Sequence, residues 1–120
     1  MLNQTVLVGR VVDDPKVVET ENGKKVSNVI LAVPRSYKNA NGEYETDYIN
    51  CTLWNQIATN TVEYCRKGDM LGVKGRIETS SYEKDGERKY KTNVIAERVT
   101  FLSTSQEKTE EKSEDQEINM

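Results

Sequence analysis

Residues 43–54 read Glu-Tyr-Glu-Thr-Asp-Tyr-Ile-Asn-Cys-Thr-Leu-Trp, and they alternate with the two-residue period of a β-strand. The odd-numbered side ends in three apolar residues that suit a core: Ile49, Cys51 and Leu53. The even-numbered side alternates aromatic rings with small polar groups: Tyr44, Thr46, Tyr48, Asn50, Thr52 and Trp54. Such a surface offers flat rings to flat groups such as nucleobases. The alternation alone leaves two interpretations open, namely rings that stack on a ligand and rings that pack under a loop or a second subunit.

The composition is that of a small chain with an excess of charge. Its 120 residues make one domain with a self-sufficient core. The hydrophobic fraction of 35% is low and the charged fraction of 31% is high for a compact fold, which predicts a polar segment attached to an ordinary domain. The chain holds no apolar run of about 18 residues, and residues 1–4 lack the charged and apolar regions that begin a signal peptide. We therefore expect a cytoplasmic protein with no membrane contact.

The residue inventory excludes most catalytic and metal-binding designs. The chain contains no histidine, so neither a Ser-His nor a Cys-His pair can form, and it has no P-loop or Gly-x-Gly-x-x-Gly pattern. Its two cysteines, Cys51 and Cys65, stand alone in the sequence, which predicts buried free thiols rather than a zinc site. We expect a protein that is not an enzyme and that has no catalytic residue, metal or cofactor. A hydrolase built from its carboxylates is the enzymatic alternative.

The net charge of −3 belongs to the end of the chain. Residues 1–104 hold 15 Lys and Arg against 14 Asp and Glu, a net charge of +1, whereas residues 105–120 hold two basic and six acidic residues, a net charge of −4. A near-neutral domain lacks the strongly basic surface of a duplex-binding protein. It is compatible with a ligand that is held by stacking and by a local group of cations.

Five β-strands separated by turn signals are predicted ahead of the acidic segment, at residues 3–12, 25–33, 43–54, 69–79 and 89–101. Hairpin turns are predicted at Asn22-Gly23, Asn41-Gly42 and Asp85-Gly86. Pro34 is expected to end the second strand. Glycines inside strands, such as Gly9 and Gly75, predict bulges or bends.

One short helix is predicted between the third and fourth strands. Apolar residues recur at helical spacing over residues 57–65. Asn55 is expected to cap the first turn, Arg66 and Lys67 suit the negative end of the helix dipole, and Gly68 is expected to stop the helix.

This order of elements predicts an all-β fold, a five-stranded OB-fold barrel with one short helix between strands 3 and 4. Toward the end of the chain, Gln, Glu, Lys, Ser and Thr replace the apolar residues. Such a composition cannot bury enough surface to offset chain entropy. We therefore predict an OB-fold domain over residues 1–103 and a disordered acidic tail over residues 104–120.

Several motifs, taken in this order, resemble the bacterial single-stranded DNA-binding proteins. They are residues 3–10 with Asp14-Pro15, then Leu31-Ala32-Val33, residues 48–54, residues 64–68 and residues 72–76. The resemblance covers about residues 1–102, and separate motifs at the right distances make it specific. It implies an OB-fold protomer, usually in a homotetramer, that coats single strands during replication, recombination and repair in the bacterial nucleoid, or in the host cytoplasm for a phage-encoded chain.

The resemblance also implies which residues contact DNA. Bases are expected to stack on four aromatic residues: Tyr37, Tyr48, Trp54 and Tyr82. Tyr48 and Trp54 are two of the even-numbered rings described above, which favours stacking over packing. Phosphates are expected to contact six cations on or beside the predicted binding strands and loops: Arg10, Arg35, Lys38, Lys74, Arg76 and Lys89. The sequence thus predicts binding of single-stranded DNA without sequence preference.

Three features depart from the family pattern. Tyrosine occupies most positions where relatives carry Trp or Phe, and it still stacks. Glu78 and the neutral residues 79–81 precede Tyr82 where relatives carry basic residues, which predicts weaker phosphate contacts there. The chain ends in residues 113–120, acidic with one apolar residue, where the family usually ends in an acidic run closed by Pro-Phe. This argues against recruitment of replication and repair proteins through the tail, and it indicates a short paralogue used in transformation or a phage- or plasmid-encoded version.

Two further binding functions are alternatives. A primosome-type OB-fold adaptor would act mainly through protein contacts and would lack the stacking aromatics, whereas all four mapped positions are aromatic here. An RNA-binding OB domain would show a preference for RNA.

Overall fold

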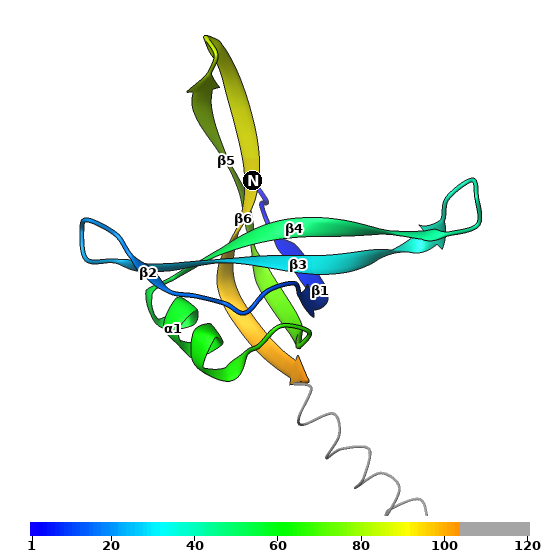
Figure 1. Cartoon of the computed structure of the whole chain (residues 1–120), viewed down its shortest axis with the longest axis horizontal. Coiled ribbons are helices and arrows are strands. Elements are labelled where there is room, and N and C mark those ends of the chain that lie inside the picture. The colour runs from blue at the N-terminus through cyan, green and yellow to red at the C-terminus, as the bar shows by residue number, and fades with distance from the viewer. Residues whose placement is uncertain (104–120) are drawn as a thin grey trace, which may run out of the picture.

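The computed structural model describes residues 1–103, and within this range the chain forms six strands and one helix (Figure 1). The elements are β1 (Thr5–Val11), β2 (Val18–Glu19), β3 (Lys25–Lys38), β4 (Tyr44–Trp54), α1 (Asn55–Tyr64), β5 (Met70–Lys84) and β6 (Glu87–Ser103). The predicted acidic tail, residues 104–120, lies outside the described residues.

The strands form a closed barrel. Their order in the sheet is β1-β5-β6-β4-β3-β2, and pairing of β1 with β3 at Arg10↔Ala32 and Val11↔Leu31 closes the circle. All neighbours are antiparallel except β4 and β6, which run parallel where Cys51 faces Val94. The two-residue strand β2 is an addition at the edge of β3, so five long strands make the barrel and α1 lies between the third and fourth of them. The predicted five-stranded OB-fold barrel is confirmed.

The barrel core confirms the predicted inner face of residues 43–54. Cys51 and Leu53 are fully buried, and Ile49 packs against the core from its margin. Leu31, Leu71 and Val73 from neighbouring strands complete the interior, and α1 covers one end of it with Ala58 and Thr61.

Two hairpin arms extend from the barrel in different directions (Figure 1). The β3–β4 arm is closed around Asn39, whose side-chain Oδ1 accepts from the backbone nitrogens of Asn41 at 2.9 Å and Glu43 at 3.0 Å. The β5–β6 arm is closed by Asp85 and Gly86, which both have positive φ (54° and 78°), the conformation of a tight two-residue hairpin turn. The predicted turns at these two places are confirmed.

The prediction that Pro34 ends the second strand is wrong. Strand β3 continues to Lys38, with Pro34 opposite Thr46 and an irregular register between Pro34 and Lys38. At this end of β3 its only described neighbour is β4, so the strand is at an edge, and an edge tolerates a residue without an N–H.

Two of the predicted helix signals, the Asn55 cap and the Gly68 stop, are wrong. Trp54 occupies the N-cap position without a side-chain cap, and Asn55 is the first helical residue, with φ at 51°. Its Oδ1 instead accepts a hydrogen bond from the backbone nitrogen of Lys25 at 3.3 Å, so the side chain binds the first residue of β3. The helix ends at Tyr64, four residues before Gly68. Gly68 lies in the turn that follows, and its backbone nitrogen donates to the Val11 carbonyl at 2.8 Å.

Glycines allow the strands to approach closely at two places. The β1–β5 register runs evenly through Gly9, so the bulge considered there is absent, and the glycine instead permits the crossing with β3. A Cβ at Gly9 would lie 2.7 Å from the Ala32 carbonyl oxygen. At Gly75 the β5–β6 register shifts between Lys74 and Gly75, which is a bulge or irregularity beside the glycine where a bend is predicted.

Candidate nucleic-acid interface

The even-numbered side chains of β4 form one face of the sheet, here called the β4 face: Tyr44, Thr46, Tyr48, Asn50, Thr52 and Trp54. Tyr48 is 69% exposed and Trp54 is 36% exposed. Cross-strand partners share a face, so β3 adds Val26, Asn28, Ile30, Ala32 and Pro34 to this surface. The rings predicted to stack on bases therefore stand on an open surface formed by two strands.

The small polar residues between the rings are held by neighbouring strands. Thr52 donates from its hydroxyl to Asn28 Oδ1 at 3.1 Å, across the β3–β4 pair. Asn50 donates from Nδ2 to Asn93 Oδ1 at 3.1 Å and so connects β4 to β6. Because these bonds hold the polar groups at the sheet, the aromatic rings project above them.

The other two predicted rings lie on the two arms. Tyr37 is exposed at the end of β3, in its irregular segment. Tyr82 is exposed on β5, opposite Lys89, and the neighbouring pair on the same face is Ser80 with Lys91. The four predicted rings are therefore spread over the sheet and both arms rather than gathered in one pocket.

Two features of the β5–β6 arm were not predicted from the sequence. Lys91 shares the face of Tyr82, and Tyr90 is exposed on the opposite face, where it lies across from Ser81. Counting pairs outward from the Asp85-Gly86 turn would have identified both, because a two-residue turn sets the register.

Arg35, one of the six predicted phosphate contacts, is engaged by carboxylates. It donates to both carboxylate oxygens of Asp47, with Nη2–Oδ1 at 3.0 Å and Nε–Oδ2 at 3.1 Å, and it also pairs with Glu45. The hydrogen bond from Arg35 lowers the pKa of the Asp47 carboxyl. The same hydrogen bond to Asp47 raises the pKa of the Arg35 guanidinium. Glu45 and Asp47 alternate with Tyr48 along β4, so these two carboxylates and the Arg35 side chain that bonds them occupy the face opposite to Tyr48.

The other five predicted cations are distributed over the surface. Arg76 pairs with Glu78 at 2.6 Å and Lys89 pairs with Glu87 at 3.3 Å. Lys38 Nζ lies 5.6 Å from the centroid of the Tyr44 ring, which is a cation–π contact. Arg10 donates to the Gly68 carbonyl at 3.0 Å, and Lys74 is exposed across from Val6 on the outer side of β5.

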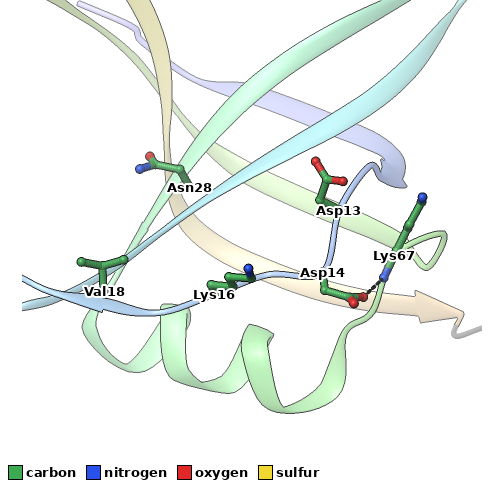
Figure 2. Close-up of a pocket in the computed structure, with 6 residues that line it drawn as sticks. All are labelled: Asp13, Asp14, Lys16, Val18, Asn28 and Lys67. Atoms are coloured by element: carbon green, nitrogen blue, oxygen red, sulfur yellow. Dashed lines mark hydrogen bonds between the residues drawn. The ribbon is translucent and has the colours of Figure 1, made fainter.

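A hollow lies between the β1–β2 connection, the loop after α1, and strands β2 and β3 (Figure 2). Its lining residues are Asp13, Asp14, Lys16, Val18, Asn28 and Lys67. Asp14 Oδ1 accepts from the Lys67 backbone nitrogen at 2.8 Å, which ties the β1–β2 connection to the loop after α1. Asn28 lines the hollow and pairs with Thr52 of the β4 face, so the hollow borders that face.

Among residues 1–103, no group of three or more His, Cys, Asp or Glu side chains could hold a metal ion. In the same part of the chain, no helix has the length and hydrophobicity of a membrane span.

These observations define a class of protein. The structure is an OB-fold barrel with exposed aromatic rings on its second and third long strands and on the hairpin between its fourth and fifth, the regions that such barrels use for oligonucleotides and oligosaccharides. Residues 2–102 match the Single-strand binding protein family. The chain belongs to this family.

Three relatives show how far the similarity reaches. Single-stranded DNA-binding protein B of Bacillus subtilis is 52% identical over 103 residues, which are 85% of this chain and 91% of that protein. A single-stranded DNA-binding protein of Bacillus cereus is 47% identical over 85% of this chain, but the matched part spans only 61% of the relative. Single-stranded DNA-binding protein 1 of Lactococcus lactis is 40% identical over 99% of this chain and 80% of its own length.

Proposed function

We propose that this chain binds single-stranded DNA without sequence preference and acts by binding rather than by catalysis. The observation that carries the proposal is the exposure of Tyr48 and Trp54 on one face of the barrel, in a chain whose relatives are named single-stranded DNA-binding proteins. Such binding would protect single strands in replication, recombination, repair or transformation. The proposed ligand implies the bacterial cytoplasm as the working compartment, or the host cytoplasm for a phage-encoded chain.

Stacking explains both the tolerance for sequence and the preference for single strands. Every base has a π-face, and a base stacked on an aromatic side chain contributes about 1–3 kcal/mol. In the proposal Tyr37, Tyr48, Trp54 and Tyr82 supply these platforms. Bases that are paired and stacked inside a DNA duplex cannot lie on the rings of Tyr48 or Trp54. We therefore expect duplex DNA not to bind this surface.

Phosphate contacts complete the proposed site. We assign them to Arg10, Arg35, Lys38, Lys74, Arg76 and Lys89. Three of these, Arg35, Arg76 and Lys89, have carboxylate partners in the free protein, so a phosphate has to compete with those carboxylates. This competition predicts a modest electrostatic contribution and a larger one from stacking.

Trp54 is the only tryptophan, and its fluorescence therefore reports on the proposed surface. The experiment is a titration with oligo-dT, a matched duplex and an RNA of equal length at two salt concentrations. We expect strong quenching by oligo-dT alone, with a salt slope of about −0.7 per phosphate neutralised. Absence of quenching, or an equal response to all three, would contradict the proposal and favour an OB-fold adaptor that contacts proteins.

We also propose that the chain assembles as a homotetramer. Among the described strands β1 pairs with β3 only at Arg10 and Val11, so its first five residues, Thr5–Gly9, have a partner on one side only. The outer side of this edge is apolar, with Val6 68% and Val8 48% exposed. An open edge beside an apolar surface is the feature that a second copy covers.

Light scattering after size exclusion tests the assembly. We expect four times the 13.7 kDa chain mass for the wild type and a smaller mass for Val8→Asp. Val18→Asp changes another exposed valine, on β2, and should leave the mass unchanged. A wild-type mass equal to that of one chain would contradict the tetramer without affecting the proposal of DNA binding.

A further inference from the structure

Tyr44 and Lys38 face each other at the far end of the β3–β4 arm. They are cross-strand partners, and Lys38 Nζ lies 5.6 Å from the centroid of the Tyr44 ring. The tyrosine is 59% exposed, so Lys38 covers only part of a ring that is otherwise open to solvent. A flat ring and a cation thus stand together, and the proposed function assigns a phosphate contact to Lys38 but no role to Tyr44.

Tyr44 lies on the same line as the rings of the proposed site. It belongs to the β4 face, four residues from Tyr48 and ten from Trp54. At about 3.3 Å per residue these separations are about 13 Å and about 33 Å. A single strand that follows β4 from Trp54 past Tyr48 would therefore reach Tyr44 next.

The arm does not need the Tyr44 ring to close. The backbone nitrogen of Asn39 donates to the Glu43 carbonyl at 2.8 Å, and that of Gly42 donates to the Asn39 carbonyl at 3.0 Å. Asn39 Oδ1 adds the two side-chain bonds described above. The turn is therefore satisfied by polar contacts, and the ring is available for a ligand.

The charges around Tyr44 favour a phosphate-bearing ligand. The β4 face itself contains no acidic residue. Glu45 and Asp47 lie on the opposite side of the strand, and Arg35 pairs with both. These two carboxylates are thus turned away from Tyr44, while Lys38 keeps three N–H donors beside the ring.

We propose that Tyr44 and Lys38 form an additional nucleotide subsite that extends the β4 face beyond Tyr48. One base stacks on the side of the Tyr44 ring that Lys38 leaves open, and the Lys38 ammonium pairs with the adjacent phosphate. The ligand is a further nucleotide of the same single strand, so the subsite rests on the proposed function.

Affinities of four chains test the subsite, each measured by quenching of Trp54 with a short and a long oligo-dT. The chains are the wild type, Tyr44→Ala, Tyr44→Phe and, as an exposed tyrosine on α1 outside the face, Tyr64→Ala. We expect Tyr44→Ala to lose about five- to a hundredfold in affinity for the long strand, and Tyr44→Phe and Tyr64→Ala to stay within about twofold. A short strand that covers only Trp54 and Tyr48 should bind the wild type and Tyr44→Ala equally.

Comparing the short and the long oligo-dT distinguishes loss of the subsite from damage to the fold. Equal loss on short and long strands, or no loss on the long strand, would overturn the subsite while leaving the proposed function intact. Failure of the wild type to quench with any oligo-dT would instead overturn the proposed function, and the subsite with it.

A second measurement needs no variant. Oligo-dT carrying 5-iodo-deoxyuridine is cross-linked to the wild-type chain by light, and fragmentation mass spectrometry identifies the modified residue. A cross-link at Tyr44 supports the subsite, and cross-links confined to Tyr48 and Trp54 contradict it.

Discussion

Arg35 and Asp47 form a bidentate ion pair across the β3–β4 arm, with nitrogen–oxygen distances of 3.0 and 3.1 Å. The pair lies on the face opposite to Tyr48 and beside Glu45, which Arg35 also contacts. Arg35, which we assign to phosphate binding, therefore also neutralises two carboxylates on an arm that is proposed to bind single-stranded DNA.

The ion pair predicts a pH dependence. The hydrogen bond from Arg35 holds the pKa of Asp47 below its ordinary value, so the pair stabilises the folded arm at neutral pH. This stabilisation is lost as the pH falls below the ordinary aspartate pKa and then through the lowered one. Carboxyl NMR across acidic pH should show Asp47 titrating at a higher pH in Arg35→Met than in the wild type. Identical titration in the two chains would show that the pair does not form in solution.

Loss of both central rings should abolish tight binding while preserving the barrel. In the double variant Tyr48→Ala, Trp54→Ala, each lost stack removes about 1–3 kcal/mol, although such losses do not simply add. Both rings are exposed, so circular dichroism should match the wild type. Because the variant lacks Trp54, its affinity is measured by anisotropy of a labelled oligo-dT. Unchanged affinity would mean that the β4 face is not the binding surface.

The two tyrosines of the β5–β6 arm should behave differently. Tyr82 shares its face with Lys89 and Lys91, whereas Tyr90 projects from the opposite face. We expect Tyr82→Ala to weaken oligo-dT binding about fivefold or more and Tyr90→Ala to change it less than about twofold. The reverse order would place the DNA on the Tyr90 side of the arm.

Gly75 should tolerate no side chain. A Cβ there would clash with the Ile95 carbonyl oxygen and lie 2.9 Å from the Ile95 carbonyl carbon, and this backbone cannot give way without disturbing the β5–β6 pairing. Gly75→Ala should lower the free energy of unfolding by about 1–3 kcal/mol or more in urea denaturation. Gly72→Ala on the same strand meets its neighbours only at 3.6 Å and beyond, so it serves as the control and should cost less. Equal stability of the two variants would contradict the close approach.

The two cysteines should be inert in the folded protein. Burial raises the pKa of both thiols, of Cys51 and of Cys65, to about 11. A thiol reagent at pH 8 should therefore label neither residue until denaturant is added. The raised values also predict that stability falls as the pH rises from the ordinary thiol value of 9.0 toward 11, because the unfolded chain loses these protons first. Rapid labelling of the native protein would contradict this burial.

Much of the barrel could be predicted from local chemistry. The alternation over residues 43–54 identified both the buried side, with Cys51 and Leu53, and the exposed rings, because a strand sends successive side chains to opposite faces. The Asn41-Gly42 and Asp85-Gly86 pairs located both arms, since few other residues adopt positive φ at low cost. These features depend on residues that are close in sequence, and the sequence alone determined them.

What only the tertiary structure decided depends on how the strands pair and on what lies beside them. The Asn55 side chain accepts a hydrogen bond from Lys25, the first residue of β3, instead of capping α1, because folding brings Lys25 next to it. Pro34 stays inside β3 because no described strand lies along that edge. Arg35 meets Asp47, and Lys38 meets Tyr44, only through the register of two strands. Local propensity carries no information on such contacts, since the register of paired strands, here irregular between Pro34 and Lys38, sets which side chains meet.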